Sequence, residues 1–136
     1  MMISRRDVVL RVSVALALLA PGNFAFARSS RTALYGLDTD NDGTVDLEEA
    51  KKAASALFDR LDGDHEGTLD RRELRGRLSA KELNEADPDH DGTLTKNEYL
   101  AVVEKRFNAA NPDRDGTLDA KELKTKVGRS LLRLLR

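Results

Sequence analysis

Residues 38–49 read DTDNDGTVDLEE, and three further segments repeat this pattern along the chain. They are DGDHEGTLDRRE at residues 62–73, DPDHDGTLTKNE at 87–98 and NPDRDGTLDAKE at 111–122. All four have an oxygen-bearing side chain at positions 1, 3 and 5, glycine at 6, threonine at 7, an aliphatic residue at 8 and glutamate at 12. We refer to them as the first to fourth loops. Oxygen donors at alternate positions of a tight turn can converge on one cation.

The pattern resembles the EF-hand calcium loop, and the resemblance extends over nearly all of the chain after residue 37. It implies that glycine at position 6 permits the sharp turn and that threonine offers its main-chain carbonyl. The resemblance further implies that the final glutamate closes each site as a bidentate ligand from the first turn of the helix that follows the loop. It also implies that the bound ion is Ca²⁺. The expected ligands are Asp38, Asp40, Asp42, Thr44 and Glu49 in the first loop; Asp62, Asp64, Glu66, Thr68 and Glu73 in the second; Asp87, Asp89, Asp91, Thr93 and Glu98 in the third; and Asn111, Asp113, Asp115, Thr117 and Glu122 in the fourth.

The four loops differ in ways that predict different affinities. The first matches the family pattern fully and also has Asp46 at position 9, while the third has aspartate at positions 1, 3 and 5. The second has the longer Glu66 at position 5, and the fourth begins with neutral Asn111. We therefore expect the first and third loops to bind most tightly. Aspartate-rich turns with glycine also occur where no ion binds, but four copies at regular intervals favour ion binding.

Apolar residues at helical spacing predict one amphipathic helix between the first two loops and another between the last two. Gly76 interrupts the middle connection, where residues 79–82 have the form of a capping box that opens a new helix. The expected fold is therefore all-α, with EF-hand helix-loop-helix repeats. Corresponding loops begin at residues 38 and 87, and at 62 and 111, so the halves 38–86 and 87–136 are expected to be a tandem duplication of a two-loop unit. The apolar positions are Leu47, Ala50, Ala54, Leu57, Phe58 and Leu61, then Leu100, Val103, Phe107 and Ala110.

The short distance between neighbouring loops limits how they can pair. A single helix of about 15 residues is about 22 Å long, so it would hold the first and second loops at opposite ends. Which loops meet stays open at this point. Whatever the pairing, the aliphatic residues at position 8 are expected to form short strand contacts; they are Val45, Leu69, Leu94 and Leu118.

The N-terminal stretch has the form of a signal peptide. Arg5, Arg6 and Arg11 precede the apolar stretch 12–20, and Ala25-Phe26-Ala27 follows it. We expect cleavage after Ala27, an EF-hand domain over residues 28–136, and a periplasmic or secreted protein. The adjacent arginines are compatible with the twin-arginine route as well as the general route. A membrane anchor is the weaker alternative, because a spanning helix takes roughly 20 apolar residues.

Composition argues against several functions. The chain has a formal net charge of −1 and no cysteine, and its acidic residues fall in the loops, so we expect cations rather than nucleic acid as ligands. No nucleophile with a matching base is apparent, so no enzymatic activity is expected. His65 and His90, at position 4 of their loops, are expected to face solvent. We expect a calcium buffer, sensor or calcium-stabilised module, and no membrane contact after signal cleavage.

The C-terminal segment 128–136, GRSLLRLLR, leaves an alternative open. Its leucines either complete the core or, with the arginines, address a protein partner or an anionic membrane surface. The second interpretation would make the chain a calcium-dependent interaction module with an unknown protein partner. A methionine-rich target groove is not expected, because Met1 and Met2 are the two methionines.

Overall fold

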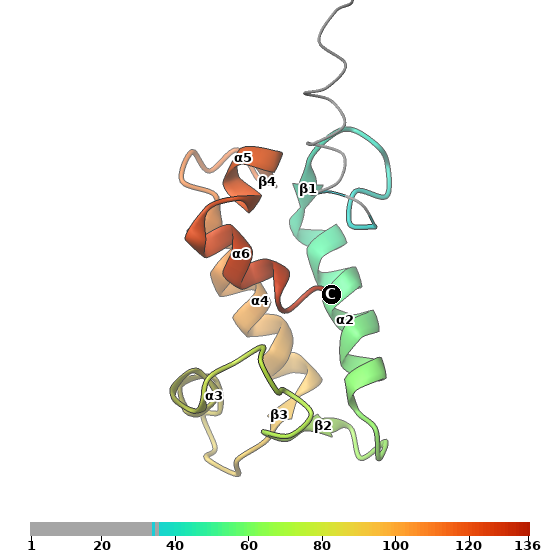
Figure 1. The fold of residues 1–136 in the computed structure, drawn as a ribbon, viewed down its shortest axis with the longest axis vertical. Helices are drawn as coiled ribbons and strands as arrows, with labels where there is room; N and C mark the ends of the chain where they lie inside the picture. The colour runs from blue at the N-terminus through green and yellow to red at the C-terminus, as the bar shows by residue number, and fades with distance from the viewer. Residues whose placement is uncertain (1–33, 35) are drawn as a thin grey trace, which may run out of the picture.

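Two long helices form the centre of the fold in the computed structural model, which describes residue 34 and residues 36–136. They are α2 (Leu47–Leu61) and α4 (Lys96–Ala110), and they pack against each other along their length (Figure 1). The short helices α3 (Ala80–Ala86) and α6 (Lys126–Leu132) pack on α4, and α5 (Ala120–Leu123) packs on α6. The predicted all-α EF-hand fold is confirmed. The expected signal peptide, residues 1–27, lies outside the described residues.

Capping boxes begin the predicted helices. Asp46 caps α2: its side chain accepts from the backbone N–H of Glu49, whose carboxylate accepts from the N–H of Asp46. The same reciprocal pair begins α4 at Thr95 with Glu98. It also begins α3 at Ser79, as predicted. In α2 and α4 the glutamate of the box is also the last residue of a loop, so the start of the helix fixes this carboxylate.

Four two-residue strands join the loops in pairs. β1 (Val45–Asp46) is antiparallel to β4 (Thr117–Leu118), and β2 (Thr68–Leu69) is antiparallel to β3 (Leu94–Thr95). The predicted contacts at position 8 are confirmed, because Val45 lies opposite Leu118 and Leu69 lies opposite Leu94. The first and fourth loops therefore meet at one end of the central helices, and the second and third at the other (Figure 1). Each pair joins segments from both halves of the expected duplication.

The core lies between α2 and α4 and extends under the C-terminal segment. Phe58 of α2 and Tyr99 of α4 meet edge to face, with ring centroids 5.7 Å apart. The hydroxyl of Tyr99 donates to the carbonyl oxygen of Leu134 at 2.9 Å, and both residues are buried. The four leucines of the C-terminal segment are core residues, which is the first of the two interpretations drawn from the sequence. They are Leu131, Leu132, Leu134 and Leu135.

The connection between the second loop and α3 is made of turns. Residues 71–77 are turns, and Gly76 has a φ of 78°, a conformation that favours glycine. Glu73 therefore closes its loop from a turn and not from a helix, which corrects the expectation that every closing glutamate begins a helix. Within the described part of the chain, none of the helices combines the length and apolar character needed to span a membrane.

Candidate metal sites

The four loops have left-handed backbone at the same two positions, 4 and 6. Gly43, Gly67, Gly92 and Gly116, at position 6, have φ values from 86° to 94°. Position 4 is also left-handed, which is uncommon for residues with a side chain. His65 and His90 occupy it and are exposed, as predicted. Two left-handed residues so close together curl each loop and bring its first and last residues near each other.

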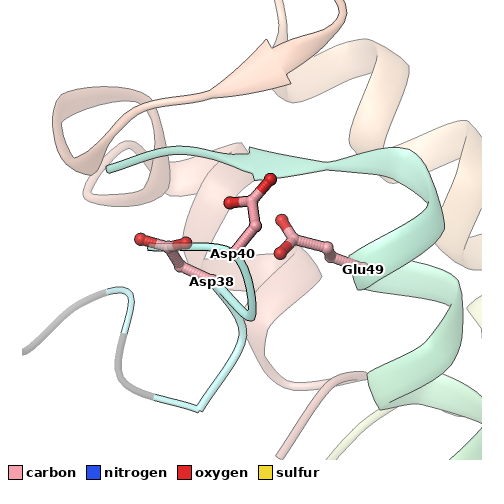
Figure 2. Close-up of side chains that lie close together, drawn as sticks. All are labelled: Asp38, Asp40 and Glu49. Carbon is pink, nitrogen blue, oxygen red and sulfur yellow. The ribbon is translucent and has the colours of Figure 1, made fainter. Parts of the chain in front are cut away.

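Three of the loops gather carboxylates into tight clusters. In each cluster one oxygen atom from every member lies within 4.8 Å of the others. Figure 2 shows the first cluster, in which Asp38, Asp40 and Glu49 converge from the loop and from the first turn of α2. Like charges at this separation repel unless a cation or a proton lies between them. The clusters are Asp38, Asp40 and Glu49; Asp62, Asp64 and Glu73; and Asp87, Asp89 and Glu98.

Position 1 supplies the strongest sign that a cation fits. Oδ1 of Asp38, of Asp87 and of Asn111 is buried and has no hydrogen-bond partner among the described residues. In Asp87 the other oxygen, Oδ2, accepts from the N–H of Gly92 at 2.8 Å, so the residue is fixed with one oxygen unpaired. Buried oxygens without partners cost free energy. A hard cation in the loop would give each of them a partner, and the all-oxygen donor set suits such an ion.

Hydrogen bonds within the loops hold positions 3 and 5. In the first loop the N–H of Asp42 donates to Oδ1 of Asp40 at 3.1 Å. The hydroxyl and N–H of Thr44 both donate to Oδ1 of Asp42 at 2.8 Å, and they lower the pKa of Asp42. Asp91 and Asp115 accept in the same way from the threonines that follow them. These side chains are therefore positioned before any ion arrives.

In the third cluster burial acts to raise the pKa of Asp87, but hydrogen bonds such as that from the N–H of Gly92 outweigh this effect and the pKa is lowered, whereas the pKa of Asp89 is raised. A hydrogen bond to the carboxyl of Asp87 raises the pKa of Asp89, and the nearby charges of Asp91 and Glu98 raise it further. In the first loop the backbone hydrogen bond from Asp42 lowers the pKa of Asp40, but burial and the charges of Asp42 and Glu49 outweigh it, so that the pKa is raised. A bound cation would take the place of the proton.

The closing glutamates differ in whether they accept a hydrogen bond from position 2 of the loop, a difference that was not predicted from the sequence. Oε1 of Glu49 accepts from the N–H of Thr39, at position 2, at 2.6 Å. Oε1 of Glu73 accepts from Gly63, also at position 2, at 2.9 Å. The third and fourth loops have Pro88 and Pro112 there, and proline has no N–H. An ion therefore competes with a position-2 hydrogen bond for the glutamate of the first two loops only. Proline at position 2 was the feature of the sequence that could have predicted this difference between the loops.

The remaining predicted ligands are less well assembled. The fourth loop forms no cluster of three carboxylates in the described structure, since Asn111 contributes an amide. Asp113, at position 3, accepts from the N–H of Asp115, at position 5, at 3.3 Å. Asp46, counted among the charges of the first loop, accepts from the N–H of Glu49 and caps α2. Glu66 accepts from the hydroxyl of Thr68 at 2.6 Å. Thr44, Thr68, Thr93 and Thr117 lie at or beside the paired strands.

Comparisons with known proteins agree with this geometry. A family profile described as "EF hand" matches residues 34–52 and 55–79, and one described as "EF-hand domain pair" matches residues 82–106. The chain is also 50% identical over 68 residues to lanmodulin of Methylorubrum extorquens (strain ATCC 14718 / DSM 1338 / JCM 2805 / NCIMB 9133 / AM1). That alignment covers 50% of this chain and 51% of lanmodulin, so the chain spans about half the length of this relative. Together with the clustered carboxylates and the paired strands, these matches identify EF-hand helix-loop-helix units along the chain.

Proposed function

We propose that the chain binds Ca²⁺ through four EF-hand loops outside the cytoplasm, as a buffer, a sensor or a calcium-stabilised module. The observation that carries this proposal is the unpaired, buried oxygen at position 1 of the first, third and fourth loops. In the first and third loops this residue also belongs to a carboxylate cluster. An ion at that point removes both the unpaired oxygen and the repulsion.

Calcium suits these loops better than magnesium does. Calcium accepts about six to eight oxygen ligands in flexible geometry, whereas magnesium demands a near-ideal octahedron at shorter distances. The loops offer side-chain oxygens at positions 1, 3, 5 and 12, all of them carboxylates except the amide of Asn111, and a main-chain carbonyl at position 7, which is a large set of oxygens on one short segment. This set of oxygens therefore favours Ca²⁺ over Mg²⁺.

Isothermal calorimetry of the full chain tests the proposal. We expect Ca²⁺ to bind at several sites and equal Mg²⁺ to bind much more weakly. Glu49→Gln should remove or weaken one site, whereas Glu48→Gln, a change of the same charge at the adjacent and exposed residue, should leave the titration unchanged. Absence of binding at millimolar Ca²⁺, or equal loss in both variants, would contradict the proposed ligand set.

A trivalent lanthanide ion is the second candidate for the same loops. Such an ion is also a hard cation that takes oxygen donors, and the similar protein is a lanmodulin. The first loop carries six acidic residues, more negative charge than one divalent ion neutralises. Titration of the calcium-loaded chain with La³⁺ separates the two candidates. Displacement of Ca²⁺ by a small fraction of La³⁺ would favour the lanthanide, and retention of Ca²⁺ would favour calcium.

Export is the part of the proposal that rests on residues 1–27. Three arginines, a short apolar stretch and Ala25-Phe26-Ala27 support it. Cell fractionation followed by mass spectrometry tests it. We expect the protein in the periplasm or the medium, with an N-terminus at Arg28. An intact N-terminus in the cytoplasmic fraction would overturn this part and leave ion binding untouched.

A further inference from the structure

The exposed face of the C-terminal segment is cationic. Lys126, Arg129, Arg133 and Arg136 recur three or four residues apart and are all exposed. The opposite face of the segment is buried in the core. The segment therefore presents a row of positive charge on its exposed side, while α6 packs against α4 (Figure 1).

These four side chains line a hollow of about 950 Å³ and have no carboxylate within ion-pair distance in the described part of the chain. The acidic residue that lines the same hollow is Glu82, which is already paired. Its Oε1 accepts from Arg106 at 2.7 Å, and its Oε2 accepts from the N–H of Ser79 at 2.8 Å. The hollow thus combines an excess of positive charge with room for a ligand.

The cationic face has a rigid base. The guanidinium of Arg106 also donates to the carbonyl oxygen of Ser130 at 2.6 Å, which ties α6 to α4. Farther along, Leu134 accepts from Tyr99. At the other end Gly128 packs so closely on α5 that an added Cβ would clash with the carbonyl oxygen of Glu122. A backbone held at three points lowers the ordering cost of binding, because only the exposed side chains must still be ordered.

We propose that this face docks a carboxylate-rich segment of a partner protein. Arginine guanidinium groups bind carboxylates with two parallel hydrogen bonds, which suits three arginines spaced along one segment. A membrane surface fits less well, because an interfacial helix must expose apolar side chains and the leucines here are buried. Val127, 38% exposed, is the one exposed large hydrophobic residue in the described structure.

Ion binding strengthens this docking, an inference that rests on the proposed function. The ion-free chain has a formal net charge of −1, so its acidic loops repel an acidic partner at long range. One bound divalent ion already makes the net charge positive, and four make it strongly so. The partner therefore binds the ion-loaded chain in preference to the ion-free chain, most clearly at low ionic strength, where screening is weak.

Fluorescence anisotropy of a labelled oligoglutamate peptide, titrated with the full chain in Ca²⁺ and in chelator, tests the proposal. In Ca²⁺, we expect Arg129→Gln with Arg133→Gln to weaken binding at least about ten-fold, the scale of losing two charge-assisted contacts. Lys52→Gln with Arg60→Gln is the matched control, because both residues are exposed on α2 and the net charge changes equally. The control should bind nearly as well as the parent chain, and chelator should weaken binding of the parent.

Equal losses in the two double variants would overturn the docking face, because net charge alone would then explain the binding. Binding to phosphatidylglycerol vesicles without binding to the peptide would overturn it in favour of a membrane surface. Peptide binding that is identical in Ca²⁺ and chelator, while calorimetry records bound calcium, would overturn the ion dependence. Absence of calcium binding would refute the proposed function instead, and the comparison of the double variants would still decide the docking face.

Discussion

Replacing Tyr99 by phenylalanine removes one hydroxyl from the junction of α4 with the C-terminal segment. The hydroxyl donates to the carbonyl oxygen of Leu134 at 2.9 Å, and both residues have exposed fractions of 0%. Phenylalanine keeps the edge-to-face contact with Phe58 and leaves the carbonyl oxygen of Leu134 buried without this donor. Tyr99→Phe therefore isolates the hydrogen bond from the packing.

A buried polar group that loses its partner costs about 1–3 kcal/mol of folding free energy. In a folded domain of about 100 residues each kcal/mol lowers Tm by about 4–8 °C, so we expect Tyr99→Phe to lower Tm by about 5–20 °C. Thermal unfolding of both chains, followed by circular dichroism in saturating Ca²⁺, measures the change. Melting temperatures that agree within a degree would refute the assignment of this hydrogen bond.

Alkaline pH offers an independent test of the same contact. Burial raises the pKa of Tyr99 to about 12, although the charges of Arg77 and Arg106 act to lower it. An unfolded tyrosine ionises near a pKa of about 10, so the unfolded state loses its proton first as the pH rises. The stabilisation is fully present below about pH 10 and is lost between about 10 and 12. The difference in stability between parent and Tyr99→Phe should shrink over that range, and a constant difference would contradict the argument.

Three further predictions concern the loops and the C-terminal segment. Glu49→Gln and Glu98→Gln should each cost more total Ca²⁺ affinity than Glu122→Gln, and calorimetry that ranks the fourth loop first would show the grading of ligands to be wrong. Gly128→Ala should destabilise the fold by about 1–3 kcal/mol and weaken the fourth loop, because its Cβ would lie 2.6 Å from Cα of Leu123 as well as against Glu122. Chelation should lower both helical content and Tm, with Ca²⁺ restoring both and equal Mg²⁺ restoring less. An ion-free chain as helical and heat-resistant as the calcium form would refute this coupling of binding to folding.

Local patterns predicted the parts of the fold that depend on local chemistry. The capping box at Ser79 and the apolar stripes of α2 and α4 involve residues a few positions apart, and the structure confirms them. The loop conformation follows in the same way from glycine at position 6. In three of the loops the candidate ligands gather because the ligands of each loop come from one short segment of the chain.

Contacts between distant segments could not be predicted in this way. Four aliphatic residues at position 8 are chemically alike, so the sequence did not distinguish Val45 with Leu118 from the other pairings. The hydrogen bond from Tyr99 to Leu134 joins a side chain to a backbone atom, and a carbonyl group is present at every residue. The turn around Glu73 escaped prediction because arginines and leucines on either side of it are good helix formers.

The helices and strand pairs connect the four loops in a closed path. α2 begins at the last residues of the first loop and has Asp62, the first residue of the second, as its C-cap. α4 joins the third loop to the fourth in the same way, with Asn111 as its C-cap. The strand pairs complete the path, since β2 with β3 joins the second loop to the third and β4 with β1 joins the fourth to the first. An ion that orders any one loop therefore restrains both of its neighbours, one through a helix and one through a strand pair. The four loops are arranged as a single unit and not as two independent halves, because residues 38–86 and residues 87–136 each supply one strand to both pairs.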